Sequence, residues 1–392
     1  MYKHRLAIIH THPIQYNSTW FIKLNQIFDV KVFYTWKQTH KGYWDKKFKR
    51  YIKWDIPLTQ NYEFEFVSNI SPKPSPNTMW GIINPRLISK IRNFNPDFIL
   101  IYGWKNLSHL IAMIYFYKKI TILFRGDSTL LDNKNSIKSQ LRHTILKWVY
   151  KHIDYALYVG RENKKYFIAN GLSSNQLIFV PHAVNNEFFL SAEEEYENQA
   201  KQWRANLGLT KNNLTFLYAG KFEPKKNIDT LIKAFLKDPN QNHRLILVGN
   251  GQEEKRLKSM ASTDKRIIFL PFQNQSVMPI VYRLGHIFIL PTSYNETWGL
   301  SVNEAMACGK AIIVSNKVGC STDLVKPNIN GFVFTYDDYT MLSELLQKMS
   351  IEKAKNMGQK SKEIIKFWSY ETGIKNITNY LLNNNNLKRH TK

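Results

Sequence analysis

Two glutamates stand on either side of a short helical sequence in the second half of the chain. Glu296 and Glu304, with seven residues between them, lie in "SYNETWGLSVNEAMACGKAI" (293–312), directly after the apolar stretch "HIFILPT" (286–292). A helix that begins near Trp298 to Ser301 would have Glu296 before it and Glu304 one to two turns inside it. Its start would present free backbone N–H groups and a dipole that favour an anion. Eight helical residues span about 12 Å, comparable to a sugar–diphosphate–ribose molecule. We therefore predict that the glutamates accept hydrogen bonds from hydroxyl groups while the helix N-terminus holds phosphates.

A second interpretation of these glutamates needs no ligand. Glu296 could be an ordinary first-turn glutamate that the helix dipole stabilises, and Glu304 could lie on a solvated face. The residues around Glu304, "NEAMACG" (303–309), are typical of a buried helix, which favours the first interpretation.

Two more loops of the second half carry residues that could bind phosphate. "AGKFEPKKNIDTLIKAF" (219–235) places Gly220, Lys221 and Lys226 before an amphipathic helix, and lysines there can hold a diphosphate as point charges. "VGNGQEEKRL" (248–257) has a Gly-x-Gly turn that allows close backbone approach. Each loop has a simpler interpretation when taken alone: an exposed basic turn for the first and a plain tight turn for the second.

Short apolar stretches that alternate with helical sequences must position these loops. Such alternation is typical of parallel, doubly wound sheets. It restarts after "LSAEEEYENQAKQWRANLGLTKNN" (190–213), a polar and charge-rich stretch that we interpret as a linker, and 392 residues predict about two domains. The expected strands are 5–10, 29–36, 97–104, 119–126 and 155–160 in the first half and 213–220, 243–250, 265–272, 286–292 and 310–316 in the second.

The chain carries a large excess of positive charge. It has 55 Lys and Arg against 30 Asp and Glu, which gives a net charge of +25. Such a surface attracts the phosphates of nucleotides, nucleic acids or anionic lipids. Lys, Asn and Ile are abundant throughout, so the excess could equally reflect compositional drift.

Cysteine content and hydropathy predict the compartment. The only cysteines are Cys308 and Cys320, so we expect no disulfide framework and a reducing environment. The longest apolar stretch, residues 110–117, is shorter than the ~20 residues of a membrane span. We expect a cytoplasmic protein that can bind the inner face of the plasma membrane from the side.

The sequence that follows the first glutamate resembles a known family. "ETWGLSVNEAMACGKAIIVSNKVGCSTDLVKPNINGFVF" (296–334) resembles the donor-site signature of the family 4 retaining glycosyltransferases, the group 1 glycosyl transferases of the GT-B fold. Loops 219–227 and 248–257 are similar to two further family segments, with Lys221 where the family has Arg and Asn227 where it has Gly. Together the similar segments cover most of residues 213–334 in the family's order. Further matches are Val318-Gly319, Asp323 and Asn330-Gly331.

The resemblance implies a fold and an activity. The fold would be α/β of the GT-B type, with two Rossmann-like doubly wound domains that face a central cleft. Residues 1–190 would bind the acceptor, residues 191–367 the nucleotide-sugar donor, and a helix within 368–392 would cross back to the first domain. The enzyme would move a hexose from a UDP- or GDP-sugar to a saccharide or lipid-linked saccharide with retention, in the assembly of lipopolysaccharide, another cell-surface polysaccharide or a glycolipid. It would use neither metal nor cofactor and bind no nucleic acid.

The resemblance also implies roles for matching residues. Lys221 and Lys226 would neutralise the leaving diphosphate, Glu296 would bind the hexose and Glu304 the ribose. Cations and N–H groups stabilise negative charge where it develops during glycosyl transfer. The predicted donor-binding set is Gly220, Lys221, Lys226, Phe272, Gln273, Asn274, Glu296, Thr297, Trp298, Gly299, Leu300, Ser301 and Glu304, of which 272–274 would line the base pocket.

The first half offers fewer candidates. Many family members have a histidine near the reacting centre, and "ITILFRGDSTLL" (120–131) has Arg125 and Asp127 in that region. They join Glu296, Lys221 and Lys226 as catalytic candidates, although a buried Arg–Asp pair explains them equally well. Gln15 and Tyr16 follow the first strand, where the family often has a glycine-rich loop, and are the acceptor-side candidates. No cluster of Asp, His or Cys has metal-ligand spacing.

Two basic and apolar stretches could contact a membrane. Residues 136–153 place Ile137, Leu141, Ile145, Trp148 and Val149 on one helical face, and residues 40–57 interleave Lys and Arg with aromatic residues. Both suit an anionic lipid surface. The first could instead be a core-facing helix, and the second could be an irregular segment that lines an acceptor groove.

Three rival functions stay open at this point. A basic nucleic-acid-binding protein would explain the net charge, but no helix-turn-helix, zinc-finger or RNP signature is present. A catalytically silent nucleotide or sugar binder could keep the fold. Another GT-B enzyme that uses nucleotide sugars, an epimerase or a phosphorylase, would use a similar site.

Overall fold

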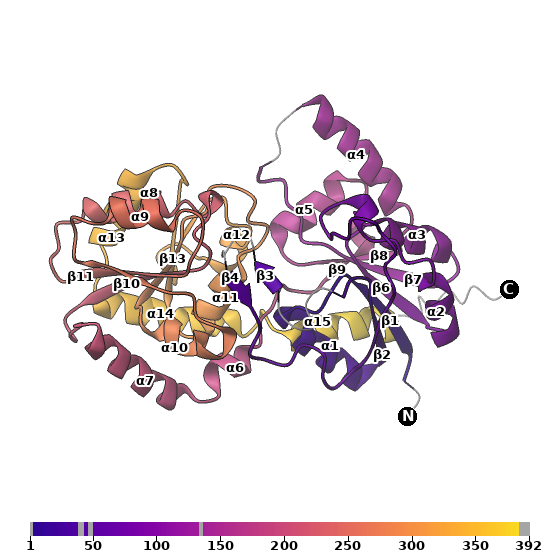
Figure 1. The fold of residues 1–392 in the computed structure, drawn as a ribbon, viewed down its shortest axis with the longest axis horizontal. Coiled ribbons are helices and arrows are strands. Elements are labelled where there is room, and N and C mark those ends of the chain that lie inside the picture. The colour runs from indigo at the N-terminus through magenta and orange to yellow at the C-terminus, as the bar shows by residue number, and fades with distance from the viewer. Residues whose placement is uncertain (1–2, 38–42, 46–49, 133–135, 384–392) are drawn as a thin grey trace. The chain divides into compact units, whose positions relative to one another are not determined.

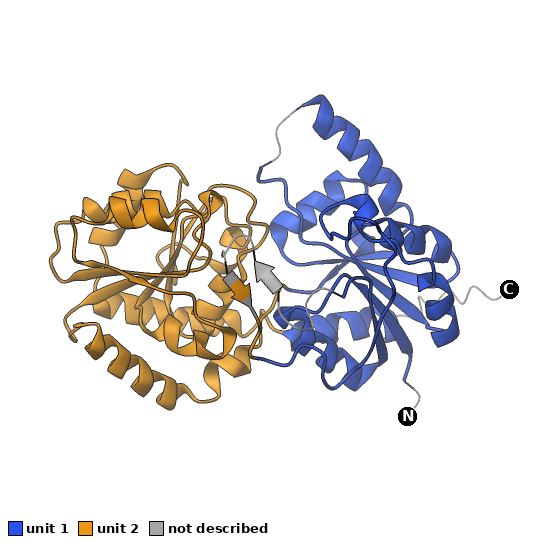
Figure 2. Cartoon of the chain, in the orientation of Figure 1, with its two compact units in different colours: residues 1–43, 56–181, 370–392 blue, residues 44–55, 182–369 orange. Residues whose placement is uncertain are grey.

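The computed structural model describes residues 3–37, 43–45, 50–132 and 136–383. The chain divides into two compact units, which Figure 2 shows in different colours. Unit 1 comprises residues 1–43, 56–181 and 370–392, and unit 2 comprises residues 44–55 and 182–369. The main division therefore falls between Pro181 and His182, whereas the sequence suggests a border after residue 190.

Unit 1 is built on a parallel sheet of seven described strands in the order β5-β2-β1-β6-β7-β8-β9. The order runs outward in both directions from the neighbours β1 and β6, and residues such as Ile8 of β1 are buried between Val32 of β2 and Leu100 of β6. All five strands expected in the first half are present. The strands are β1 (Arg5–His10), β2 (Asp29–Tyr34), β5 (Glu63–Phe66), β6 (Phe98–Tyr102), β7 (Thr121–Arg125), β8 (Tyr155–Tyr158) and β9 (Leu177–Phe179).

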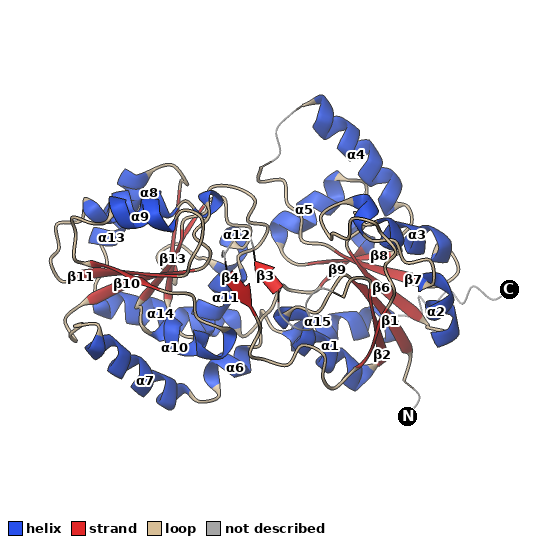
Figure 3. Ribbon diagram, viewed as in Figure 1, coloured by secondary structure: helices blue, strands red, loops and turns tan. Residues whose placement is uncertain are grey.

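Helices cover both faces of the unit 1 sheet (Figure 3). The core that they enclose is apolar, with Ile99, Phe116, Phe124 and Val149 at its centre. The helices are α1 (Gln15–Ile27), α2 (Leu87–Phe94), α3 (Leu107–Phe116), α4 (Ile137–Tyr150), α5 (Arg161–Ala169) and α15 (Tyr370–Thr378).

The last helix belongs to unit 1 although the preceding residues belong to unit 2. The Tyr370 hydroxyl donates to the Tyr16 carbonyl (2.8 Å), and the Asn376 amide donates to the Phe179 carbonyl (2.8 Å). These contacts hold α15 to α1 and to the end of β9. The expected crossover of the C-terminal helix is therefore confirmed.

Unit 2 repeats the same plan with a sheet of six described strands in the order β12-β11-β10-β13-β14-β15. Every pair is parallel, and the reversal of order lies between β10 and β13. All five strands expected from apolar stretches are present, and so is β15, the last strand that the resemblance implies at Asn330-Gly331. The strands are β10 (Leu214–Ala219), β11 (His243–Val248), β12 (Ile267–Leu270), β13 (Ile287–Leu290), β14 (Ala311–Ser315) and β15 (Gly331–Phe334).

The helices of unit 2 also cover both faces of their sheet (Figure 3). They are α6 (Asn186–Leu190), α7 (Glu193–Asn206), α8 (Ile228–Leu236), α9 (Glu254–Met260), α10 (Met278–Arg283), α11 (Leu300–Ala307), α12 (Ser321–Leu324), α13 (Tyr339–Gln347) and α14 (Ile351–Ile365). Among the helices that the structure describes, none combines the length and the hydrophobicity that crossing a membrane requires.

The stretch expected to be a linker, residues 190–213, is mostly helix α7, so that prediction was wrong. Polar side chains attach the helix to the body of unit 2. Arg204 donates to the Thr215 hydroxyl (2.8 Å), and Glu197 lies 3.2 Å from the Arg283 guanidinium. A helix that is held mainly by polar contacts buries few apolar side chains and so shows little apolar periodicity. Its sequence is therefore similar to that of a linker.

The basic and aromatic stretch 40–57 is only partly described. Strands β3 (Tyr43–Asp45) and β4 (Arg50–Ile52) form a two-stranded sheet, and residues 40–42 and 46–49 lie outside the described residues. The expectation of an irregular segment is therefore wrong for the two strands.

Candidate active site

The candidate site of unit 2 lies where the strand order reverses. In open α/β sheets, ligands bind beyond the carboxyl ends of strands at this point, because the loops there lead away in opposite directions. The loop after β10 carries Lys221 and Lys226, and the loop after β13 carries Glu296. Residues 70 positions apart in the sequence thus meet at one sheet edge.

Lys226 and Glu296 form an ion pair at this edge. Their side chains are 14% and 13% exposed, and the Thr292 hydroxyl donates to the same Glu296 oxygen (3.2 Å). Burial alone would raise the pKa of Glu296, but the charges of Lys226 and Lys225 and the hydrogen bonds from Lys226 and Thr292 outweigh it. The pKa therefore lies below its ordinary value, and the carboxylate is charged at neutral pH beside a cation.

The loop after β10 is fixed against the loop after β13 by backbone and side-chain contacts. Lys225 accepts a backbone hydrogen bond from Ser293 (2.9 Å) and its Nζ donates to the Asn295 carbonyl (3.4 Å). The Lys221 carbonyl accepts from the Tyr218 hydroxyl (2.8 Å). The lysine-rich turn is thus held in place by the neighbouring loop. This favours its interpretation as part of a binding site over that as an exposed basic turn.

Asn227 explains how this loop departs from the sequence pattern of the family. Its φ is +54°, a left-handed conformation that Gly adopts freely and Asn tolerates better than most residues. Its side-chain amide also donates to the carbonyls of Pro291 (3.2 Å) and Tyr336 (2.7 Å). Asn therefore satisfies the backbone requirement that Gly would meet and adds a connection to β13.

Glu304 lies inside α11 and is 3% exposed. The Tyr282 hydroxyl donates to one of its oxygens (2.6 Å) and the Gln275 amide to the other (3.0 Å). The helix begins only at Leu300, so four residue steps, about 6 Å of rise, separate its first residue from Glu304. The expected placement of Glu296 before the helix and of Glu304 one to two turns inside it is therefore confirmed. The span of about 12 Å for eight helical residues does not describe their separation, because Glu296 lies in the loop before the helix.

The start of α11 depends on a glycine. Gly299, the residue before the helix, has φ +95°, and a Cβ there would lie 3.0 Å from side-chain atoms of Leu290 and Val318. Leu300 and Ser301 then form the first helical turn. The predicted helix N-terminus is confirmed, because the start at Leu300 lies within the expected range from Trp298 to Ser301.

The Trp298 side chain has a structural place. It is buried, its Nε1 donates to Asn303 Oδ1 (2.9 Å), and its ring lies 5.2 Å from that of Trp368. Asn303 in turn donates to the His182 carbonyl (2.9 Å). Only the backbone of Trp298 remains as a candidate for ligand binding.

The Val318-Gly319 turn supports the loop that carries Glu296. The Gly319 N–H donates to the Glu296 carbonyl (3.0 Å), and a Cβ on Gly319 would lie 1.9 Å from the Thr297 carbonyl oxygen. Only Gly permits this approach. The Gly-x-Gly turn after β11 has a similar role, because a Cβ on Gly249 would lie 1.9 Å from the Gly220 carbonyl oxygen.

The predicted base loop, Phe272–Asn274, follows β12 and has a neighbour that the sequence did not reveal. The Asn274 amide donates to the Lys53 carbonyl (2.8 Å), and the Ser276 N–H donates to Asp55 (3.2 Å). Lys53 and Asp55 belong to the segment 44–55 that groups with unit 2. Nothing in the local sequence of that segment indicates the contact.

The first-half candidates all belong to unit 1. Arg125 is buried and donates to the carbonyls of Val180 (3.1 Å) and Pro181 (3.3 Å), the last residues before unit 2. Burial lowers its pKa, and Tyr102 and Asp127 oppose this shift. Gln15 and Tyr16 open α1, with the Tyr16 carbonyl accepting from Tyr370 as described above.

Buried histidines at the carboxyl edge of the unit 1 sheet were not predicted as a group. His109 Nδ1 lies 2.9 Å from the Tyr102 carbonyl and its Nε2 3.0 Å from the Thr35 hydroxyl. His10 Nε2 lies 2.7 Å from the Asn17 amide. Burial lowers the pKa of His10 to about 3 and that of His109 to about 4, so both are neutral.

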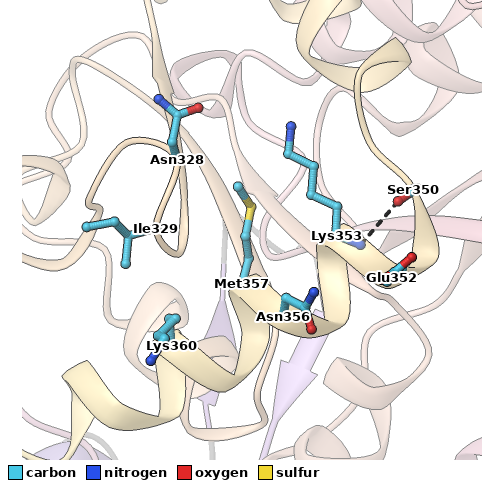
Figure 4. Close-up of a pocket in the computed structure, with 8 residues that line it drawn as sticks. All are labelled: Asn328, Ile329, Ser350, Glu352, Lys353, Asn356, Met357 and Lys360. Atoms are coloured by element: carbon cyan, nitrogen blue, oxygen red, sulfur yellow. Dashed lines mark hydrogen bonds between the residues drawn. The ribbon is translucent and has the colours of Figure 1, made fainter.

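One pocket lies away from these residues. It is open, has a volume of about 520 Å³, and lies between α14 and the loop before β15 (Figure 4). None of the predicted site residues lines it. Its lining residues are Asn328, Ile329, Ser350, Glu352, Lys353, Asn356, Met357 and Lys360. Among the described residues, no group of three or more His, Cys, Asp and Glu could hold a metal ion.

Comparison with known proteins connects this geometry to a family. Residues 199–364 match the family model of the glycosyl transferases group 1. The chain is 24% identical over 236 residues to an uncharacterized glycosyltransferase of Methanocaldococcus jannaschii, with 58% of each chain covered. It is 24% identical over 226 residues to the lipopolysaccharide 1,2-N-acetylglucosaminetransferase of Salmonella typhimurium, with 54% of this chain and 58% of that one covered. The chain thus spans less than two thirds of the length of either relative.

A solved structure matches nearly the whole chain. HepE of Anabaena, in complex with UDP and glucose, has a TM-score of 0.72 at 16% identity, and the match covers 96% of this chain and 99% of that one. Both sheets are parallel with a central reversal of order, as doubly wound domains require. The chain therefore has the GT-B fold, and its residues 199–364 are similar to the glycosyl transferases of group 1.

Proposed function

We propose that the chain is a retaining glycosyltransferase that moves a hexose from a UDP- or GDP-sugar to a saccharide or a lipid-linked saccharide. The observation that carries the proposal is the Lys226–Glu296 ion pair at the point where the unit 2 strand order reverses, next to the start of α11. A cation, a charged carboxylate and a helix N-terminus at one sheet edge match the phosphates and hydroxyl groups of a nucleotide sugar.

Each donor group has a partner in this arrangement. Lys221, Lys226 and the first N–H groups of α11 would bind the diphosphate, and Glu296 would accept hydrogen bonds from the hexose. Without a donor, Lys226 neutralises Glu296. This ion pair holds the lysine in place before the donor arrives. The diphosphate can then bind the same ammonium group as a second anion, with little further loss of side-chain entropy. Glu304 would accept from the ribose, with Gln275 and Tyr282 holding its carboxylate.

The same groups would promote the reaction. As the bond from the hexose to the diphosphate breaks, negative charge grows on the diphosphate and positive charge on the sugar ring. Lys221 and Lys226 would stabilise the first and the Glu296 carboxylate the second. Retention requires the acceptor oxygen to enter on the face that the diphosphate leaves. No step requires a metal ion.

We further propose that unit 1 binds the acceptor. Gln15 and Tyr16 open α1 soon after β1 ends, Arg125 is the last residue of β7, and Asp127 follows it, so all four lie near the carboxyl edge of the unit 1 sheet. Relatives support the substrate classes: the Salmonella enzyme is named for transfer to lipopolysaccharide, and HepE binds UDP and glucose. In the same proposal, residues 272–274 line the base pocket and residues 296–304 bind the sugar, the phosphates and the ribose.

The test is donor turnover with a matched control. The intact chain is incubated with UDP-, GDP- and ADP-hexoses and a panel of saccharide and lipid-linked acceptors, while release of nucleoside diphosphate is followed. We expect release that depends on the acceptor, and a loss of at least 100-fold in Glu296→Gln but less than twofold in Glu344→Gln, an exposed glutamate of α13. Release without any acceptor would favour a different nucleotide-sugar enzyme, and equal rates in the two variants would refute the site.

A further inference from the structure

Helix α4 is packed against unit 1 only along its second half. Leu146, Val149 and Tyr150 enter the apolar core of the unit, whereas every residue from Ile137 to Ile145 is exposed or half-buried. Figure 1 shows the helix at the periphery of unit 1, beside α3 and α5. Its first two turns therefore extend past the core that fixes the rest of the helix.

The exposed face of α4 is apolar. Ile137 is 85% and Leu141 63% exposed, and Ile145 and Trp148 are exposed as well. These four residues, here called the α4 stripe, recur at intervals of four, four and three, so they share one side of the helix. The buried side is made by Leu146, Val149 and Tyr150 instead. The alternative prediction, that the apolar face of this helix packs against the core, is therefore wrong for the four residues of the α4 stripe.

Cations lie on both sides of the α4 stripe. At 100° per residue, Lys138 and Arg142 follow it on one flank and Lys147 and Lys151 on the other. Residues 136–153 contain no Asp or Glu. An apolar stripe between two rows of cations is the pattern of a helix that lies in a lipid–water interface.

The surface continues from α4 onto the end of α3 through aromatic rings. The His152 ring lies 4.9 Å from that of Trp148 and 5.1 Å from that of Tyr117, the residue after α3. Lys118 and Lys119 follow, both exposed, with their ammonium groups over the rings of Tyr117 (5.3 Å) and Tyr115 (3.9 Å). Aromatic rings with polar edges favour the headgroup region of a bilayer, and lysine beside them adds charge for anionic lipids.

We propose that the α4 stripe, its flanking cations and Lys118–Lys119 form a docking surface for an anionic lipid bilayer. The helix would lie in the plane of the interface, with the stripe among the upper acyl chains and the ammonium groups at the phosphates. If two copies of this chain associated through this surface, the six cations of one copy would face the six of the other. No acidic residue of α4 or of the end of α3 would offset their repulsion. Charge therefore favours lipid over a second copy. The proposal does not rest on the transferase activity.

The experiment measures co-sedimentation of the intact chain with vesicles. Vesicles of phosphatidylcholine alone are compared with vesicles in which about a third of the lipid is phosphatidylglycerol, over a range of salt concentrations. We expect binding to the anionic vesicles that weakens as salt is raised, and much weaker binding to phosphatidylcholine. Sedimentation without lipid, at the same protein concentrations, reports self-association.

Two pairs of variants identify the surface. Ile137→Ser/Leu141→Ser should lower the partition coefficient at least tenfold, because the apolar side chains no longer leave water, whereas Ile70→Ser/Phe367→Ser, exposed residues elsewhere, should change it less than twofold. Lys138→Gln/Lys151→Gln should lower it about 25-fold, roughly fivefold per lysine, and Lys73→Gln/Lys233→Gln should leave it nearly unchanged.

Every other outcome contradicts the proposal. If the stripe variant and its control bind alike, the apolar face is not in the lipid. If all variants bind phosphatidylcholine as tightly as anionic vesicles, the cations have no part in it. A dimer that forms without lipid and is lost in Ile137→Ser/Leu141→Ser would show that a second copy covers the stripe. Thermal unfolding of the variants, expected within a few degrees of the parent because all the replaced residues are exposed, excludes misfolding as the cause.

Discussion

Replacement of Glu304 separates the structural part of the candidate site from its proposed part in ligand binding. The carboxylate is buried and accepts hydrogen bonds from Tyr282 (2.6 Å) and Gln275 (3.0 Å). Hydrogen bonds to a charged group contribute about 1.5–3 kcal/mol each, and a buried donor that loses its acceptor costs about as much. Glu304→Ala should therefore lower the free energy of unfolding of unit 2 by about 3–5 kcal/mol.

The same change should also lower the affinity for the nucleotide-sugar donor. If the carboxylate accepts from ribose hydroxyl groups, its loss removes one or two charge-assisted hydrogen bonds, which corresponds to a rise in Kd of about 10- to 100-fold. Tyr282→Phe is the control, because it removes one donor and leaves the carboxylate. It should lower stability by about 1.5–3 kcal/mol and change the Kd less than about threefold.

The assay combines denaturant unfolding with titration of UDP and GDP. Glu304→Gln supplies a variant of the same shape in case Glu304→Ala does not fold. An unchanged nucleotide Kd in Glu304→Gln and Glu304→Ala would refute the ribose assignment. A loss of affinity in Tyr282→Phe as large as that in Glu304→Ala would show that the glutamate acts only by holding the fold.

Three further predictions follow from single features. Gly319→Ala should lower unit 2 stability by about 1–3 kcal/mol and weaken nucleotide binding in the same titration, because its Cβ would displace the Thr297 carbonyl; unchanged binding would mean that the turn does not support the site. Asn227→Ala should cost about 1 kcal/mol more than Asn227→Gly in chemical unfolding, because only Gly keeps the left-handed conformation at no cost; equal losses would leave the side-chain hydrogen bonds as the whole effect. Burial lowers the pKa of His10 to about 3 and those of His12 and His109 to about 4, so only the unfolded state takes up their protons below about pH 6.5. Unit 1 should therefore lose about 4 kcal/mol of unfolding free energy between pH 7.5 and 5.5, and a flat pH profile of unfolding would contradict their burial as neutral groups.

The sequence predicted the sheets well and some of their surroundings poorly. Buried parallel strands are continuous apolar stretches, so the ten expected strands could be located without other knowledge. β5, whose sequence is "EFEF", alternates at the edge of its sheet, and β9 has three residues, so neither produces such a stretch. Helix α7 was missed because polar contacts such as that of Arg204 attach it, and a hydrophobic pattern cannot show them.

The candidate site could be predicted where its residues are close in sequence. Glu296, the start of α11 and Glu304 lie within nine positions, so their order alone indicated a linked set. The partners of Glu304 come from α10 and the turn before it, and the contact of Asn274 with Lys53 joins residues 221 positions apart. Such contacts depend on the complete fold, and a single sequence carries no local pattern for them. The same holds for the bonds from the Arg125 guanidinium to the Val180 and Pro181 carbonyls, which lie 55 and 56 positions along the chain.

The central claim is that the Lys226–Glu296 edge of unit 2 binds a nucleoside diphosphate. Titration calorimetry of UDP and GDP against the parent chain, Lys226→Met and the matched control Lys233→Met tests it most directly, since Lys233 lies on α8 and is paired with Asp229. The account predicts that the parent chain binds one of the two nucleotides, that Lys226→Met raises the Kd at least tenfold, and that Lys233→Met changes it less than twofold. Binding of neither nucleotide, or equal affinity in Lys226→Met and the parent, would contradict it.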